Sequence, residues 1–375
     1  KFIGSNGLIG LVATLLICII LLLCHMAFAG PIQRTGYELF FTWYPLLAII
    51  NLPYNTALVI MQADQKFGKL FLVKAINSGG FFMVLLVNYL FLQMTLPQLV
   101  WALLIVNLLT SAICMLAGWD GLKHLRKATK ETNRTILDFG KYTTFTLIGT
   151  NLLRSADTLI ISISPLGTAA VALYSIPMKL TELQQIPLRS FVATAFPKMS
   201  KASIQGKVQE VKELFYTYSG AMSYLFVGIS LFTFVFADFF VLILGGRQYL
   251  GTDPVTGFNT ANIVRIFSLY GLLLPIDRMT GIGLDSINKP NINALKVLYM
   301  VIFNIAGDLV AIFIFKSLAL VAVGSILFTI IGIWVGFYYF SRELSLNYLR
   351  IFSNGIGFYK SMFDKVLKRP VHKSA

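Results

Sequence analysis

The sequence predicts an all-α membrane protein with many spans, and two observations support this. Of the 375 residues, 57% are hydrophobic and only 13% are charged, whereas soluble globular domains carry about 25% charged residues. The apolar residues form runs of roughly 20, the length of helix that crosses about 30 Å of hydrocarbon. Because lipid offers the backbone no hydrogen-bond partner, every span must be helical.

Apolar runs predict ten spans in order along the chain. They are 7–28, 38–61, 70–92, 97–118, 138–162, 167–196, 214–236, 262–286, 291–314 and 317–340. The alternate connections contain only Arg34, Arg247 and Lys316, while the other connections and the tail hold most of the 31 Lys and Arg. Loops rich in Lys and Arg stay in the cytoplasm. We therefore expect a cytoplasmic tail and cytoplasmic loops at 119–137 and 197–213.

Ionisable residues lie deep in the fifth and sixth spans, where hydrocarbon is expected. They are Arg154, Asp157, Lys179, Glu182 and Arg189. A charge at that depth costs several kcal/mol unless it faces protein or water, so it marks a functional site by default. These spans therefore favour a transporter.

The stretch from Phe139 to Ser200 has an ordered set of motifs. Arg-x-x-Asp precedes an apolar run, and Leu-Gly, Ala-Leu-Tyr, a polar helix with prolines and Ala-Phe-Pro-Lys-Met-Ser follow. Their order and spacing resemble the seventh and eighth helices of Wzx-type polysaccharide flippases, in the multidrug/oligosaccharidyl-lipid/polysaccharide (MOP) exporter superfamily. The resemblance implies two six-helix lobes around a central cavity. It also implies that an oligosaccharide, joined by pyrophosphate to a polyprenyl lipid, is moved across a bacterial inner membrane.

A weak internal repeat is consistent with this architecture. Leu52-Pro53-Tyr54-Asn55 recurs as Leu274-Pro275-Ile276-Asp277, and Lys74 matches Lys296 at the same offset. Each unit is expected to contain a helix broken by proline, and the repeats are expected to be parallel, related by an axis along the membrane normal. On this alignment the first repeat lacks about two helices before Lys1, so we expect an N-terminally truncated chain.

The expected organisation has four parts. They are an N-terminal lobe at 1–118, a basic cytoplasmic linker at 119–137, a C-terminal lobe at 138–340 and a cytoplasmic tail at 341–375. Apolar residues alternate with Lys and Arg in the tail. This pattern predicts an amphipathic helix on anionic headgroups, with partner binding as the alternative.

Helical spacing relates the candidate site residues to one another. Lys179, Glu182 and Arg189 share one stripe of a helix. Arg154 and Asp157 are i, i+3 neighbours that could pair, or could form a structural ion pair that locks two helices. Lys74 and Lys296 are expected to extend to the membrane surface.

A basic cavity would attract a diphosphate, because guanidinium matches phosphate oxygens in a forked geometry. The candidate ligands of the pyrophosphate are Arg154, Lys179, Arg189 and Arg278. We expect the first three to face a cavity between the lobes. The carboxylates that could couple transport to an ion gradient, or be structural, are Asp157, Glu182, Asp277 and Asp308.

Other classes of protein are less consistent with the sequence. Cys18, Cys24 and Cys114 form no CxxC pair, and we expect no catalytic residue, cofactor or metal. The dispersed basic residues suit a lipid bilayer better than nucleic acid. We expect a monomer, with a polysaccharide polymerase as a candidate partner. The open alternatives are a lipid II flippase, a drug or cation exporter of the same fold, and a membrane glycosyltransferase or polymerase.

Overall fold

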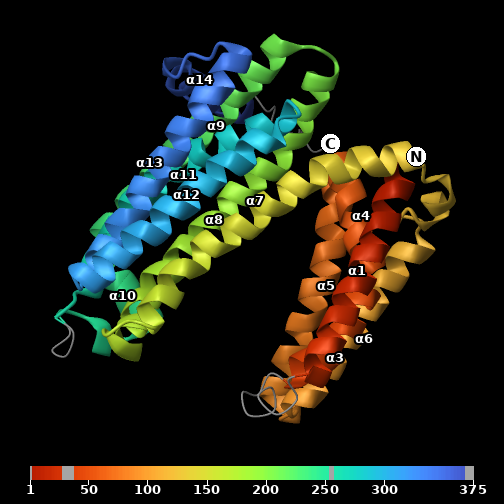
Figure 1. Cartoon of the computed structure of the whole chain (residues 1–375), viewed down its shortest axis with the longest axis horizontal. Coiled ribbons are helices and arrows are strands. Elements are labelled where there is room, and N and C mark those ends of the chain that lie inside the picture. The colour runs from red at the N-terminus through yellow and green to blue at the C-terminus, as the bar shows by residue number, and fades with distance from the viewer. Residues whose placement is uncertain (1, 28–37, 253–256, 368–375) are drawn as a thin grey trace, which may run out of the picture. The chain divides into compact units, whose positions relative to one another are not determined.

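The computed structural model describes residues 2–27, 38–252 and 257–367, and these are largely helical (Figure 1). The chain divides into two compact units, Lys1–Asp138 and Phe139–Ala375, and each is described by itself. The charge distribution that predicts the orientation includes five residues outside the described ones, namely Lys1, Arg34, Lys368, Arg369 and Lys373.

The first unit is an antiparallel set of long helices. They are α1 (Phe2–Ala27), α3 (Glu38–Ile50), α4 (Leu52–Ala63), α5 (Phe67–Val87), its π-helical extension η1 (Asn88–Leu92) and α6 (Leu96–Leu116). Helices α3 and α4 meet at an angle of 50°. Pro53 lies in the first turn of α4, where its missing N–H costs nothing. The predicted proline break is therefore present in this unit.

The segment that follows is not a simple loop. The 3-10 helix η2 (Leu122–Lys127) contacts α1, and α7 begins at Lys130. The expected linker at 119–137 thus contains a short helix and the first turns of a long one.

The second unit is built around α11. Its helices are α7 (Lys130–Ser162), which starts in the first unit, α8 (Gly167–Ile204), α9 (Val208–Val235), α10 (Ala237–Gly245), α11 (Thr260–Ser286), α12 (Pro290–Leu309), its π-helical extension η4 (Val310–Ile314), α13 (Leu318–Leu344) and α14 (Leu349–Leu367). Helix α11 packs against α8, α9 and α13. It continues through Pro275 without a break, so the expected proline break is absent from the second repeat. Packing on three sides holds α11 in one piece.

Three hydrophobic clusters contain residues of α11. One includes Ala261 and Val264, the second Ile263 and Phe267, and the third Leu274, Met279 and Leu284. Polar and ionisable side chains of α11 are found between and beside these clusters. They form the wall of the pocket described below.

Each predicted span overlaps a long helix or helix pair, which confirms the all-helical fold. By length and composition, six described helices could cross a membrane, or seven if the bent pair α3–α4 is one span. Helices α7, α8 and α11 are not among them, and they carry most of the ionisable residues of the candidate site. The total of ten spans remains a prediction.

Candidate functional site

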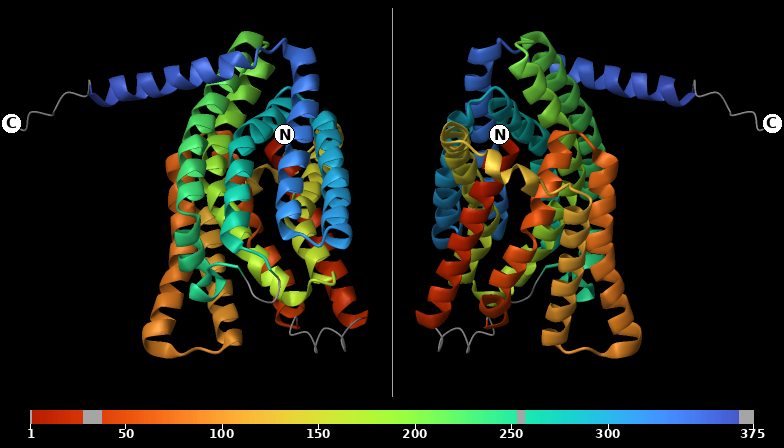
Figure 2. Two further views of the ribbon diagram at one scale, coloured as in Figure 1. Left: turned by 90° about the vertical axis from the view of Figure 1, so that its left-hand side faces the viewer. Right: turned by 90° about the vertical axis from the view of Figure 1, so that its right-hand side faces the viewer.

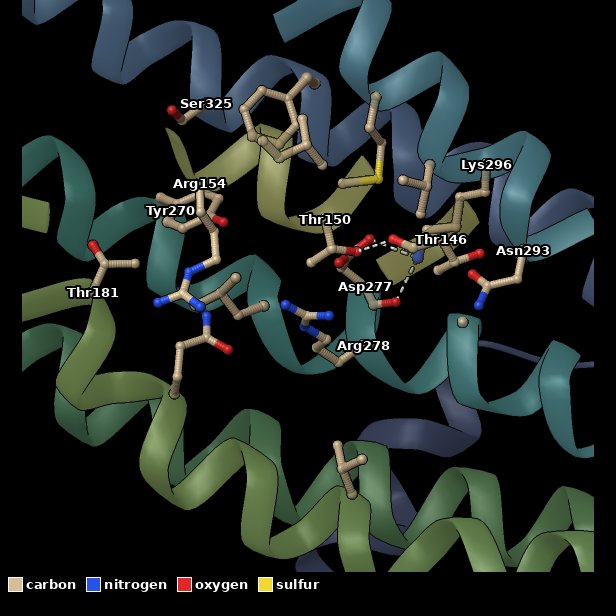
Figure 3. A pocket seen from close by; sticks show the side chains of 18 of the residues that line it. Thr146, Thr150, Arg154, Thr181, Tyr270, Asp277, Arg278, Asn293, Lys296 and Ser325 are labelled. Carbon is tan, nitrogen blue, oxygen red and sulfur yellow. Dashed lines mark hydrogen bonds and ion pairs between the residues drawn. The ribbon is translucent and has the colours of Figure 1, made fainter. Parts of the chain in front are cut away.

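A pocket lies inside the second unit, lined by side chains of α7, α8, α11, α12 and α13 (Figure 3). The space open to the centres of water-sized molecules is about 210 Å³. A single buried water needs only about 10–15 Å³. The pocket therefore has room for a ligand much larger than water.

The charged residues of this pocket are mixed in sign. Its wall contains three basic residues, Arg154, Arg278 and Lys296, and four acidic ones, Asp157, Glu182, Asp277 and Asp285. The excess of basic residues that the sequence suggested for the cavity is absent from this pocket. What a ligand meets here depends on which charges are already paired.

Lys296 and Asp277 form a buried ion pair between α12 and α11. The Lys296 Nζ lies 2.6 Å from Asp277 Oδ1, and it also donates to the Asp277 carbonyl and to Thr280 Oγ1. Only 2% of Lys296 is exposed, so the expectation that it extends to the membrane surface was wrong. A buried ammonium needs a counter-charge and further hydrogen bonds, and the adjacent helix supplies both. Lys74, its counterpart in the repeat, is exposed.

Arg154 pairs with Glu182 on α8 and not with its neighbour Asp157. The Arg154 Nη2 donates to Glu182 Oε1 at 2.9 Å, and 41% and 61% of the two side chains are exposed. The i, i+3 spacing allowed a pair with Asp157, but Asp157 turns into the helix packing. An exposed pair of this kind contributes at most about 1 kcal/mol. Arg154 can therefore exchange Glu182 for another anion at little cost.

Arg278 has a different environment. It lines the pocket from α11, and no ion pair or hydrogen bond of its guanidinium is found among the described residues. Figure 3 shows that the guanidinium groups of Arg278 and Arg154 turn toward the same open space. A guanidinium carries five N–H donors. Those of Arg278 are available to a ligand.

A second polar group lies behind the pocket wall, and we call it the carboxylate cluster. It consists of Asp157, Tyr174, Asn304, Asp308 and Ser325. The Tyr174 hydroxyl donates to Asp157 Oδ2 at 2.7 Å. The Asn304 amide donates to Asp157 Oδ1 at 3.1 Å and to Asp308 Oδ2 at 3.2 Å, and Ser325 Oγ lies 3.5 Å from Asp157 Oδ2. One amide thus bridges two carboxyl groups.

The carboxylate cluster is closed to solvent. Asp157 is 3% exposed, and Asn304 and Asp308 are 0% exposed. The Oδ1 atoms of Asn304 and Asp308 have no hydrogen-bond partner in the part of the chain that the structure describes. Buried oxygens without a partner are rare and need an explanation such as a bound ion or water. Asp157 and Ser325 also line the pocket, so the cluster and the pocket share a wall.

Lys179 and Arg189 do not line this pocket. Both are exposed on α8, as are Glu182 and Ile186, so the predicted stripe is one face of the helix. Of that stripe, only Glu182 reaches the pocket. A role for Lys179 and Arg189 in a cavity between the lobes stays a prediction.

The sequence identified several residues that the structure brings together, namely Arg154, Asp157, Glu182, Asp277 and Arg278. It missed Lys296 as a pocket residue, although Lys296 and Asp277 lie on opposite sides of a short turn between two helices. It also left Asp285 unassigned, which accepts a 3.0 Å hydrogen bond from Asn293. Tyr270 also lines the pocket, but nothing in the sequence distinguishes it from the other aromatic residues.

Replacing Lys296 with Met should strongly lower stability, because Asp277 would remain buried without its counter-charge. Breaking a buried ion pair in this way costs about 3–5 kcal/mol. Lys74→Met is the matched control and should change stability by less than about 0.5 kcal/mol, as exposed sites do. Thermal unfolding of the purified protein in detergent measures both. The double variant Lys296→Met/Asp277→Asn should recover part of the lost stability, because it no longer buries an unpaired carboxylate. Equal melting temperatures for Lys296→Met and Lys74→Met would contradict the account.

Comparison with known proteins gives a family and a fold. The family described as polysaccharide biosynthesis protein matches residues 7–254. A search of curated proteins gave no match.

Solved structures match over most of the chain. A MOP superfamily transporter from Pyrococcus furiosus, described as having a binding pocket of reverse polarity, matches with a TM-score of 0.78 and 15% identity, over 92% of this chain and 78% of that one. An outward-facing multidrug resistance MATE family transporter of the MOP superfamily gives 0.75 and 15%, over 92% and 78%. A variant of the Vibrio cholerae MATE transporter VcmN gives 0.74 and 13%, over 93% and 80%. The chain has the fold of these transporters.

Proposed function

Because the chain belongs to the polysaccharide biosynthesis protein family and has the MOP transporter fold, we propose that it is a lipid-linked oligosaccharide flippase. Its substrate is an oligosaccharide joined through pyrophosphate to a polyprenyl lipid. The protein carries this headgroup from the cytoplasmic to the outer leaflet of a bacterial inner membrane. Rocking of two lobes gives access from each side in turn, while the lipid tail stays in the bilayer.

The observation that carries this proposal is the guanidinium of Arg278, which lines the pocket and has no partner in the described part of the chain. A charge inside a membrane domain is costly unless it meets an opposite charge or water, so an anionic ligand stabilises it. Arg forms forked hydrogen bonds to phosphate oxygens. Arg154 turns to the same space and is held only by the exposed carboxylate of Glu182. A diphosphate can bridge the two guanidinium groups.

The carboxylates of the pocket do not oppose this binding as strongly as their number suggests. Asp277 is neutralised by Lys296, Asp285 accepts from Asn293, and Asp157 accepts from Tyr174 and Asn304. The donors left for a ligand are therefore those of the two arginines. Sugar hydroxyls next to the diphosphate find polar partners in the Thr146, Thr181 and Gln185 side chains of the wall.

The alternatives have different requirements. An exporter of organic cations would bind its substrate through a carboxylate such as Asp285, which among the described residues accepts a hydrogen bond from Asn293 but forms no ion pair. A glycosyltransferase or polymerase would form a new glycosidic bond, which an assay with purified protein detects directly. A lipid II flippase needs the same diphosphate chemistry, so the two substrates are separated by comparing their transport in the same preparation.

Replacing Arg278 with Ala should lower transport at least about tenfold, because hydrogen bonds to charged groups contribute about 1.5–3 kcal/mol each. Arg278→Lys should restore only part of the activity, because Lys lacks the fork. Arg265→Ala is the matched control on the same helix, since Arg265 binds Asp238 outside the pocket. The readout is surface polysaccharide in a flippase-deficient strain, with protein levels measured in parallel. Normal polysaccharide from well-expressed Arg278→Ala would refute the role of this arginine.

The carboxylate cluster supplies the ion coupling in this proposal. Two carboxyl groups bridged by one amide, in a site that excludes solvent, cannot both stay ionised without a compensating positive charge. A proton on one carboxyl, or a monovalent cation at the free Oδ1 atoms of Asn304 and Asp308, supplies it. Because Asp157 is common to the cluster and the pocket wall, binding of the ion can change the pocket.

Asp308→Asn should abolish the dependence of transport on an ion gradient, because it removes one of the two negative charges. Proteoliposomes with an imposed proton gradient, or separately a sodium gradient, distinguish the two ions. Asp238→Asn is the control, since Asp238 is exposed and pairs with Arg265, which is not part of the cluster. Unchanged acceleration of Asp308→Asn by both gradients would exclude the cluster as the coupling site.

A further inference from the structure

Helix α14 (Leu349–Leu367) is fixed to α9 along one of its faces. Ile351 is 1% exposed, and a Cβ atom at Gly355 would lie 2.6 Å from the backbone of Gly220, so the two helices approach closely. Asn354 donates to Glu213, and the Tyr359 hydroxyl donates to the Ala221 carbonyl. Helix α14 is thus a docked element of the second unit.

An apolar stripe of α14 remains uncovered by α9. Leu349, Phe352, Ile356 and Phe363 are 66%, 46%, 59% and 60% exposed. Their spacing of i, i+3, i+7 and i+14 places them on one side of the helix, next to the face that α9 covers. The apolar side of α14 is therefore wider than its contact with α9 requires.

The charge of this segment has one predominant sign. Lys360 is exposed at the edge of the apolar stripe, and the sequence continues with Lys365, Lys368, Arg369 and Lys373. Asp364 is the only acidic residue of 349–375. A basic helix with one apolar stripe is suited to a surface that has an apolar interior and a negatively charged outer layer. Anionic lipid headgroups over acyl chains are such a surface.

The direction of α14 agrees with this. In Figure 2 it extends sideways from the end of the bundle, across the direction of the long helices. The 27-residue helix α13 precedes it and is roughly 40 Å long at 1.5 Å per residue, more than the hydrocarbon thickness of about 30 Å. The chain thus leaves α13 near a membrane surface, and α14 can lie in the plane of that surface.

We propose that α14 is an interfacial helix that binds anionic phospholipid through the stripe Leu349, Phe352, Ile356 and Phe363. The stripe enters the boundary between headgroups and acyl chains, and Lys360 beside it contacts lipid phosphates. On its neighbouring face, α14 contacts Glu213, Gly220 and Ala221, and these contacts connect the membrane-bound helix to α9. The surface is separate from the transport pocket and does not depend on the identity of the transported substrate.

The test uses the full-length protein with Cys18, Cys24 and Cys114 replaced by Ser, in nanodiscs. A fluorophore is attached to Ile356→Cys on the apolar stripe, or to Ser361→Cys as the matched control, because Ser361 is exposed on the side of α14 away from the stripe. In nanodiscs that contain phosphatidylglycerol, brominated acyl chains should quench the Ile356→Cys label and aqueous iodide should not. The Ser361→Cys label should behave in the opposite way.

The contribution of charge to the binding of lipid by α14 is tested separately. Replacing Lys360 with Glu, or using phosphatidylcholine alone, should increase iodide quenching of the Ile356→Cys label severalfold. A single symmetric peak in size-exclusion chromatography confirms that each variant folds, and Phe352→Cys replaces Ile356→Cys if that variant fails. Equal iodide quenching at Ile356→Cys and Ser361→Cys in anionic nanodiscs would overturn the proposal. Protection in native membranes but not in nanodiscs would also overturn it, because a protein partner would then cover the stripe.

Discussion

The buried ion pair between Lys296 and Asp277 determines the chemistry of the pocket. It gives a counter-charge to the carboxylate that precedes Arg278 on α11. Consecutive residues of a helix point about 100° apart, so Asp277 pairs with Lys296 on α12 while Arg278 turns into the pocket. Asp277 is thus already neutralised, and the guanidinium of Arg278 has no partner among the described residues. An equal number of charges without this pairing would give a pocket of different selectivity.

Helix α7 connects the two polar regions of the second unit. Arg154 faces the pocket and pairs weakly with Glu182, while Asp157, less than one turn later, is held in the carboxylate cluster. A change in the occupancy of the cluster that rotates or shifts α7 would also move Arg154 relative to Arg278. This arrangement gives a physical route from ion binding to substrate binding through one helix, in agreement with the proposed alternating access.

The sequence was sufficient for the helical fold and for part of the site, because both follow from the cost of charge in an apolar segment. Arg154, Asp157, Asp277 and Arg278 could be recognised as site residues from their depth in apolar runs. Their partners could not, because a helical period defines a face without defining which helix covers it. Lys296 thus appeared to be a surface lysine, and Arg154 was placed beside Asp157 although its side chain reaches Glu182 on another helix. Lys179 and Arg189 share a face as predicted, yet of that face only Glu182 lines the pocket.

The most direct test of a diphosphate site is binding of a short-chain polyprenyl diphosphate to the purified protein. Native mass spectrometry or thermophoresis can compare it with the corresponding monophosphate, for the wild type and for Arg278→Ala. The account predicts that the wild type prefers the diphosphate and that Arg278→Ala loses this preference at least about tenfold, the equivalent of about 1.4 kcal/mol, with an unchanged melting temperature. Equal affinity of the wild type for both lipids, or an unchanged preference in a folded Arg278→Ala protein, would contradict it.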